Sequence, residues 1–186
     1  MPISGPAVAQ TDPSTIELQV EKVGQLFDTL DPMPFREKDL DRDAEDYIVG
    51  WARELPRKAP LRILIHMPPA EASGEHAQIL GQAVGGYFNY RADALSKDLK
   101  ELFRVGRYSL CIGLVMLAGC MTSGRLISRA MGPGEFSALF TEGLIILGWV
   151  ANWRPIEIFL YDWWPIVRHR NMLRRLARAE IVINPR

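Results

Sequence analysis

Two apolar stretches in the C-terminal half constrain this chain more than any other feature. Between Arg107 and Arg125 lie 17 residues without a formal charge, and a second stretch, from Phe136 to Trp153, carries one acid, Glu142. A helix rises about 1.5 Å per residue, so each stretch covers roughly 26 Å, close to the thickness of a bilayer's hydrocarbon core. We therefore predict a transmembrane helical hairpin over residues 107–153.

The N-terminal half predicts a small soluble head. Residues 1–107 hold 13 basic and 17 acidic side chains, a net of −4, whereas residues 108–186 hold 9 and 5, a net of +4. Residues 16–23 alternate apolar and polar side chains, which predicts a strand, and residues 61–69 form an apolar run that predicts a buried strand. Residues 44–55 carry one apolar face, typical of a helix, and precede Pro56. Residues 1–15 lack the features of a secretion signal and are expected to form a flexible arm.

A long helix is predicted to join the head to the hairpin. From residue 75 to residue 106 the apolar positions fall near heptad spacing, and between Lys100 and Ser109 only Gly106 weakens the helix. Gly81, Gly85 and Gly86 also weaken this helix unless they face a closely packed neighbour. The connection over residues 126–135 contains glycine and proline, which predicts a turn.

The last segment, residues 154–186, mixes aromatic, acidic and basic residues. This composition is unlike that of a bilayer-spanning helix, so we expect the chain to bend out of the membrane at Pro155 and to form a helix along the membrane surface. A short strand over Ile181–Ile183 is expected to return to the sheet of the head.

The expected fold class is therefore α+β. A cytoplasmic α/β head of about three strands and two helices, with its long linker helix, occupies residues 16–106 after the arm at 1–15. The transmembrane hairpin follows at 107–153, and a C-terminal interfacial helix and strand complete the chain at 154–186.

Charge and aromatic residues predict the orientation in the membrane. The turn between the spans offers only Arg125 and Arg129, so the positive-inside rule and an even number of spans place both termini in the cytoplasm. The lipid bilayer is the expected partner, and specific recognition of anionic lipid is a less favoured alternative. Five basic residues expected to face the lipid surface follow the second span: Arg168, Arg170, Arg174, Arg175 and Arg178. Five aromatic residues are expected to form a belt at the inner interface: Trp149, Trp153, Tyr161, Trp163 and Trp164.

Two groups of charged residues are candidate sites. Glu142 is the acid within a span, where it either makes a structural hydrogen bond near the outer interface or serves an ion or proton pathway; we favour the structural role. Arg154, Glu157 and Asp162 stand close together in the sequence after the second span. We favour a structural ion-pair cluster over a ligand site there, because charges near hydrocarbon need partners.

Nothing in the sequence predicts a catalytic residue, a metal site or a cofactor. The histidines, His66, His76 and His169, lack the spacing of a metal-binding pair, and no glycine-rich phosphate loop follows a strand. Cys111 and Cys120 both lie in the first span, where a thiol behaves as a small apolar group. We expect no enzyme and no nucleic-acid partner; a ligand site in the head beside His66 and His76 is a weaker, enzymatic alternative.

Small residues in the first span suggest close helix packing. Ala118 with Thr122, and Gly119 with Ser123, stand four residues apart. Together with the heptad-like helix, this spacing makes the chain a candidate for self-association. The expected protein partner is therefore a second copy of the chain or another component of a membrane complex.

Several blocks of the sequence carry a resemblance: PFREKDLDRDAEDYIVGWA, YFNYRA, GRYSLCIGL and EGLIILGWVANWRPIEIFLYDWWPI. Over about Leu26 to Arg178, the chain resembles a family of bacterial two-span membrane proteins to which no activity is assigned. The resemblance implies an inner-membrane protein and supplies no catalytic residues.

The leading functional hypothesis is a non-enzymatic bacterial inner-membrane protein that works as an oligomeric scaffold or assembly component with a cytoplasmic head. The alternative is an oligomeric channel or transporter subunit that uses Glu142 and the Arg154/Glu157 pair.

Overall fold

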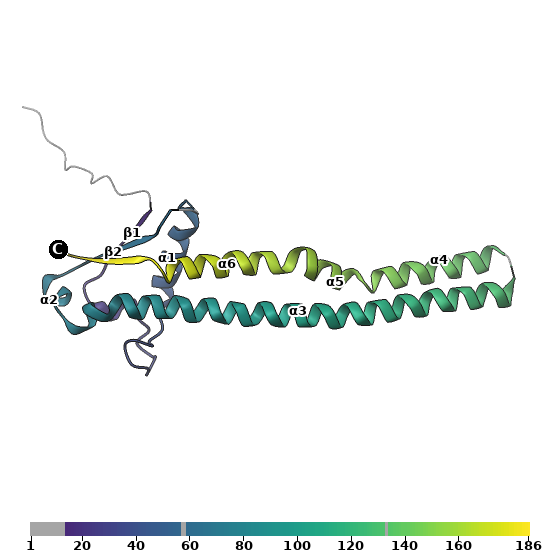
Figure 1. The fold of residues 1–186 in the computed structure, drawn as a ribbon, viewed down its shortest axis with the longest axis horizontal. Helices are drawn as coiled ribbons and strands as arrows, with labels where there is room; N and C mark the ends of the chain where they lie inside the picture. The colour runs from purple at the N-terminus through teal and green to yellow at the C-terminus, as the bar shows by residue number, and fades with distance from the viewer. Residues whose placement is uncertain (1–13, 57–58, 133) are drawn as a thin grey trace, which may run out of the picture. The chain divides into compact units, whose positions relative to one another are not determined.

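The computed structural model describes residues 14–56, 59–132 and 134–186, so the expected flexible arm lies almost wholly outside the described residues. The chain forms two compact units. The first, which we call the head unit, comprises Met1–Ala94 and His169–Arg186, and the second, the hairpin unit, comprises Leu95–Arg168. Helix α3 (Glu75–Met131) and helix α6 (Trp163–Leu176) each contribute residues to both units (Figure 1).

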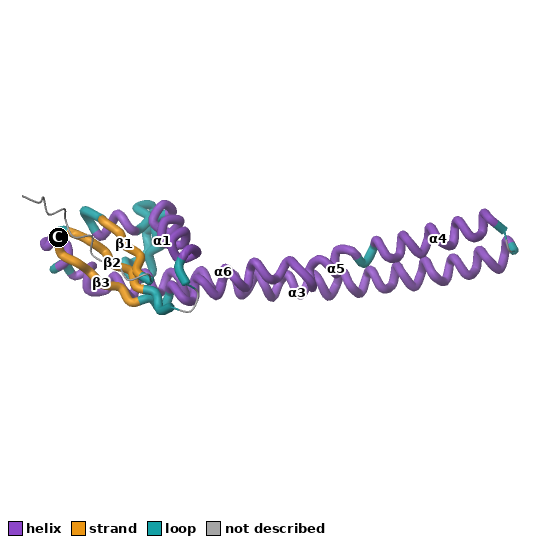
Figure 2. The backbone as a smooth tube through the Cα atoms, turned by 90° about the horizontal axis from the view of Figure 1, so that it is seen from above, coloured by secondary structure: helices purple, strands orange, loops and turns teal. Residues whose placement is uncertain are grey.

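A parallel three-stranded sheet forms the centre of the head unit (Figure 2). Strand β2 (Arg62–Met67) lies in the middle, with β1 (Thr15–Gln19) on one side and β3 (Glu180–Pro185) on the other. Ile63 pairs in register with Ile16 and with Ile181. The predicted combination of helices with three strands is confirmed, and the last strand of the chain joins the sheet directly beside β2.

Apolar side chains from helices complete the core of the head unit. Helix α1 (Arg42–Glu54) begins at Asp41, whose carboxylate accepts a hydrogen bond from the Asp43 N–H at 3.0 Å. The helix ends ahead of Pro56, as predicted, because proline cannot continue it. The short elements η1 (Val23–Leu26) and α2 (Pro69–Ala72) connect the larger ones. The most deeply buried large side chains on the helices of this unit are Ile48, Leu80, Phe88, Leu173 and Leu176.

A close contact explains one of the helix-weakening glycines. A Cβ added at Gly85 would lie 3.1 Å from the backbone oxygen of Ala177, just after α6. Glycine therefore lets α3 approach the chain that leads into β3. This contact lies within the head unit.

Helix α3 runs without interruption for 57 residues. The prediction that the linker helix continues into the first apolar stretch is thus confirmed. The turn between the two apolar stretches is shorter than predicted, because the helix continues to Met131 and the next one, α4 (Glu135–Val150), begins at Glu135. Residues 126–131 contain no helix breaker, and Gly132 adopts a left-handed φ of 73°, the usual way to end a helix.

The helix of the return segment breaks earlier than predicted. The helix breaks at Ala151–Asn152, ahead of Pro155, between α4 and α5 (Trp153–Glu157). A proline lacks the N–H and its ring displaces the carbonyl four residues earlier, which here belongs to Ala151. A π-helical turn, η2 (Ile158–Asp162), then leads into α6.

The C-terminal part of α6 does not match a helix lying along a surface. Leu173 and Leu176 are each only 1% exposed and belong to the head unit, as does strand β3. Their three-residue spacing puts both leucines on one face of α6, where they pack into the core. The pattern of apolar residues in this segment is therefore explained by the head's core rather than by lipid.

Small residues line the contact between the two helical arms of the hairpin unit. A Cβ at Gly106 would lie 2.8 Å from Ile158 Cγ2, and one at Gly148 would lie 2.7 Å from Leu117 Cδ1. The predicted small-residue pairs are not at this contact, since Ala118, Gly119, Thr122 and Ser123 are all exposed. Gly113 and Gly124 are buried instead, at positions on the same stripe as Gly106.

Candidate functional site

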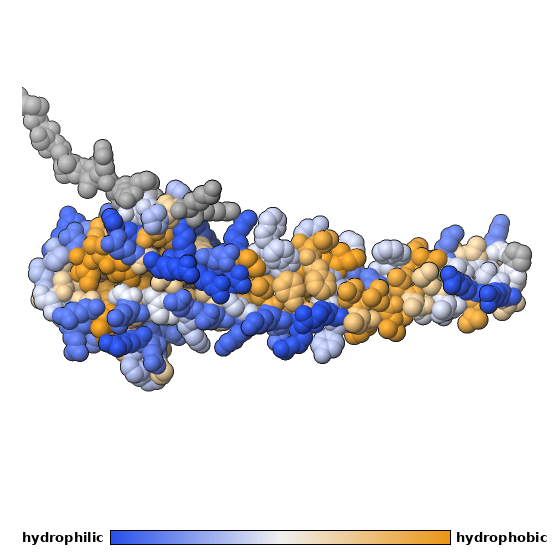
Figure 3. Space-filling model, viewed as in Figure 1, coloured by the Kyte–Doolittle hydropathy of each residue, from blue (hydrophilic) through white to orange (hydrophobic). Residues whose placement is uncertain are grey.

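The outer surface of the hairpin unit is the most distinctive feature of the described chain. Its two helical arms are long and apolar enough to cross a membrane, and in each the most apolar window is only 17% buried. Large apolar side chains point outward on both arms; Val115 and Phe136 are each 73% exposed. Figure 3 shows apolar residues gathered along this unit. The core helix of a water-soluble protein would bury these side chains.

Glu142 lies on this apolar surface rather than between the arms. Its neighbour Thr141 faces α3, where its hydroxyl donates to the Gly124 carbonyl at 3.3 Å, and a Cβ at Gly124 would lie 3.1 Å from its Cγ2. Glu142 itself is exposed, and among the described residues its carboxylate has neither a hydrogen bond nor an ion pair. An acid at such a position normally meets a partner helix, a lipid headgroup or water.

The structure brings the three members of the predicted charge cluster together. Nη1 of Arg154 lies 3.2 Å from Oε2 of Glu157 and 3.0 Å from Oδ2 of Asp162. The other oxygen of Glu157 accepts a hydrogen bond from Nε1 of Trp153 at 2.8 Å. Each charge of the cluster thus has a partner within the chain, an arrangement that suits a structural role.

The five aromatic residues of the predicted belt lie on four successive elements. Four of them are largely exposed, and Trp163 is half-buried with its Nε1 donating to the Phe159 carbonyl at 2.9 Å. The exposed rings are Trp149 on α4, Trp153 on α5, Tyr161 on η2 and Trp164 on α6.

The five basic residues divide into two groups. Arg168, Arg174 and Arg178 are exposed, whereas Arg170 and Arg175 are half-buried. Arg175 donates to the carbonyl of Ala59 at 2.7 Å and also to that of Pro56, so its guanidinium fastens the loop before β2 to α6. A shallow hollow of about 460 Å³ in the head unit is lined by Pro60, Leu61, Asn171, Arg174, Arg175 and Arg178.

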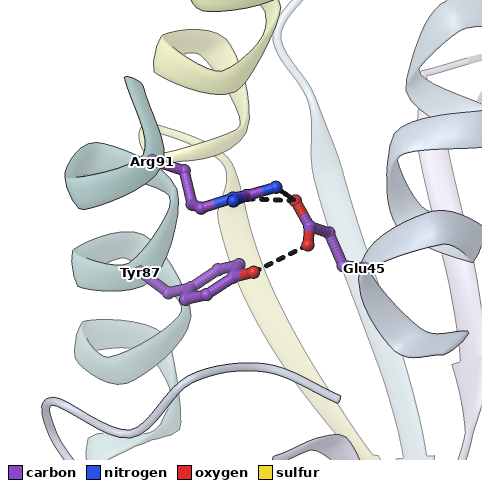
Figure 4. Close-up of polar contacts among 3 residues, drawn as sticks. All are labelled: Glu45, Tyr87 and Arg91. Carbon is purple, nitrogen blue, oxygen red and sulfur yellow. Dashed lines mark hydrogen bonds and ion pairs between the residues drawn. The ribbon is translucent and has the colours of Figure 1, made fainter. Parts of the chain in front are cut away.

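A polar cluster of the head unit has no signal in the sequence patterns described above. Glu45 on α1 accepts a hydrogen bond from the Tyr87 hydroxyl at 2.7 Å and pairs with Arg91 at 3.0 Å (Figure 4). Tyr87 and Arg91 stand four apart on α3, which places them on one face of that helix. The cluster fastens α1 to α3.

The electrostatics of this cluster fix its protonation states. Burial and the hydrogen bond to Glu45 raise the pKa of Tyr87 above its ordinary value, so the phenol remains a donor. Burial opposes the charge on Arg91, but the Glu45 carboxylate outweighs it and raises the pKa of that guanidinium. Burial, assisted by Arg53 and Arg91, lowers the pKa of His169. The carboxylate is thus neutralised by donors that do not release protons near neutral pH.

A second polar residue that sequence reasoning missed lies at the contact between the helical arms. Asn152 is 5% exposed, and its side-chain amide donates to the Gly113 carbonyl at 3.0 Å and to the Gly148 carbonyl at 2.9 Å. A Cβ at Gly113 would lie 2.5 Å from the Asn152 Oδ1, so the amide fits only against glycine. The sequence signal that could have indicated this residue is an asparagine placed directly before a helix that contains a proline.

The histidines and cysteines form no shared site. His66 lies on β2, with Nε2 3.7 Å from Glu17 Oε2 and Nδ1 3.2 Å from Asn184 Nδ2, while the His76 ring packs against Phe35. Within the described ranges no group of three or more His, Cys, Asp or Glu side chains could hold a metal ion. Cys111 is exposed and Cys120 is buried, and both are free thiols.

Comparison of the chain with protein-family models, with curated proteins and with solved structures found no match. The resemblance to two-span bacterial membrane proteins therefore stays a prediction.

Proposed function

We propose that this chain is an integral protein of the bacterial inner membrane that acts as an oligomeric scaffold or assembly component, without catalytic activity. The hairpin unit crosses the bilayer twice, and the head unit works in the cytoplasm. Residues 107–153 supply the two spans.

One observation supports membrane insertion above all others, namely the apolar exterior of the hairpin unit. Ile112, Val115 and Ile146 are each more than 60% exposed, although they lie in the middle of long helices. In water, such a surface would cost about 25 cal/mol for each Å² of apolar area. In hydrocarbon the same surface is favourable, and the arms need only small contact residues and a polar amide between them, as membrane helices do.

The charge distribution supports the cytoplasmic placement of the head. The tip of the hairpin offers Arg125 and Arg129, whereas the chain after the second span carries Arg168, Arg170, Arg174, Arg175 and Arg178. Both termini then lie on the cytoplasmic side.

The contacts of the head unit support a scaffold rather than an enzyme. The carboxylate of Glu45 is held by two donors, and Arg175 is held by two backbone carbonyls. His66 lies between neighbours on two adjacent strands. These groups serve packing, and an active site needs a group left available for substrate.

A channel or transporter subunit is the second candidate, and Glu142 is the observation that favours it. The Arg154/Glu157 pair favours it less, because those charges neutralise each other and Asp162. Loss of ion flux from proteoliposomes on Glu142→Gln would support conduction, and absence of flux from the wild type would exclude it.

Membrane insertion is tested by fractionation of cells that express the full chain. We expect the protein to stay in the membrane pellet after alkaline carbonate washing and to be released only by detergent. A fusion after residue 186 should be fluorescent with green fluorescent protein and inactive with alkaline phosphatase. Protein that remains dispersed in detergent-free buffer would overturn the proposal.

A further inference from the structure

Two opposite charges on the hairpin unit lack partners in the part of the chain that the structure describes. Among the described residues, neither the guanidinium of Arg125 on α3 nor the carboxylate of Glu142 on α4 takes part in a hydrogen bond or an ion pair, and both side chains are exposed. Exposed apolar residues flank them toward the tip of the hairpin, including Leu126, Phe136 and Leu139. Charges in such surroundings are costly unless a partner reaches them.

Arg125 and Glu142 lie at nearly the same level of the hairpin. Gly124 and Thr141 touch across the two helices, since a Cβ at Gly124 would lie 3.1 Å from Thr141 Cγ2. Each charged residue is one position beyond that contact. One residue advances a helix by about 1.5 Å, and α3 and α4 advance in opposite directions. Arg125 and Glu142 are therefore separated by only about 3 Å along the axis of the hairpin.

The two charges also lie on the same side of the hairpin. One residue turns a helix by about 100°, so each charged side chain is rotated by that angle away from the helix–helix contact. The rotations have opposite sense when both helices are viewed from one end, because α3 and α4 are antiparallel. Both side chains are therefore carried to one and the same face, which we call the Arg125/Glu142 face.

We propose that the Arg125/Glu142 face is the surface on which a second copy of this chain docks in the membrane. The inference rests on the proposed membrane insertion and deepens the proposed self-association. A two-fold axis along the membrane normal sets α3 of one copy against α4 of the other, at equal depth. Arg125 of each copy then meets Glu142 of the other, so a single symmetric contact neutralises all four charges.

Other residues of the face fit this occupant. By helical periodicity Arg129 on α3 and Glu135 on α4 point to the same side near the tip, and they repeat the complementarity of opposite charges. Ala118, exposed and two turns below Arg125, is small enough to let a partner helix approach. Binding of a lipid headgroup, or an ion pair within one copy, would explain neither the second pair of opposite charges, Arg129 and Glu135, nor the small residue Ala118 on this face.

The test measures association of full-length protein in lipid vesicles by energy transfer between donor-labelled and acceptor-labelled copies. Glu142→Arg alone and Arg125→Glu alone each place like charges opposite one another twice in a two-fold dimer. We expect each variant to associate roughly tenfold or more weakly than the wild type. An equimolar mixture of the two variants restores both pairs across the interface, so it should associate like the wild type.

Two further variants test whether the effect is specific to this face and to the charge of Glu142. Ser123→Arg adds a charge to α3 at the same depth but on the opposite side, and we expect it to leave association unchanged. Glu142→Gln keeps the size of the side chain and should weaken association without disturbing insertion, which circular dichroism and membrane fractionation check.

The outcomes separate this inference from the proposed function. Unchanged association in Glu142→Gln and in both charge reversals would overturn the inference while leaving an oligomeric scaffold in place. Rescue only when both reversals are in one chain, and not in the mixture, would show a pair within one copy and would also overturn it. A monomeric wild type would remove the inference and the proposed oligomer together.

Discussion

The head unit and the hairpin unit are stabilised by opposite arrangements of side chains. In the head unit the large apolar residues point inward, as Phe88 and Ile63 do, and charges such as Arg62 and Glu180 pair on the surface. In the hairpin unit most of the large apolar residues point outward, while glycines and an asparagine lie at the contact between the helices. The first arrangement suits water and the second suits hydrocarbon.

The comparison predicts that truncating a core side chain of the head has the largest effect. Phe88→Ala should lower the free energy of unfolding of the head unit by about 3–5 kcal/mol, because it removes a fully buried ring. Tyr90→Ala, two residues along the same helix and 65% exposed, is the control and should change it by under about 0.5 kcal/mol. Hydrogen exchange of peptides from residues 75–94, with the full chain in detergent micelles, measures both.

In the hairpin unit enlarging a residue should matter more than truncating one. Gly148→Leu places a side chain where a Cβ already meets Leu117 at 2.7 Å, and we expect a loss of about 1–3 kcal/mol. Gly143→Leu, on the same helix with nothing within 4 Å, is the matched control. Unfolding by sodium dodecyl sulfate, followed by tryptophan fluorescence, reports the difference; equal stability of the two variants would contradict the close contact.

The amide between the arms tests the hairpin unit in a second way. Asn152→Ala removes two hydrogen bonds to backbone carbonyls, and we expect the same unfolding assay to lose about 0.5–1.5 kcal/mol. The neighbouring Ala151→Ser keeps a small residue and should have little effect. No change in Asn152→Ala would mean that the small-residue contact alone holds the arms together.

The smallest expected effect is the pH dependence of the head unit. Burial, with Arg53 and Arg91, lowers the pKa of His169 from the ordinary 6.5 in the folded state. The unfolded chain therefore binds more protons near that pH, and stability of the head should fall as the pH drops below about 6.5. His169→Gln should flatten this slope in thermal unfolding from pH 5 to pH 7.5, and an unchanged slope in this variant would contradict the prediction.

Local patterns in the sequence were sufficient to predict many elements. The alternation at Ile16 and Leu18, the apolar run before Met67 and the absence of a breaker from Glu75 onward each correspond to an observed strand or helix. The predicted position of the helix break, at Pro155, is wrong, because a proline disrupts the hydrogen bond to the carbonyl four residues earlier and the helix breaks there.

Long-range partners could not be predicted in the same way. The bond between Tyr87 and Glu45 joins residues 42 positions apart, and the bond between Asn152 and Gly113 joins residues 39 positions apart. No periodicity in either segment specifies the other. The small residues Ala118 and Thr122 suggest a helix contact, but the contact forms on a stripe roughly a third to a half of a turn away from them.

The sequence by itself determined which segments are helical, which are strands and which are too apolar for water, because those properties depend on backbone conformation and on transfer from water residue by residue. Only the tertiary structure decided which face of each helix is covered, where the C-terminal segment packs and which charges remain unpaired. Those outcomes depend on contacts between distant segments, and a contact is a property of two surfaces that no single stretch of sequence contains.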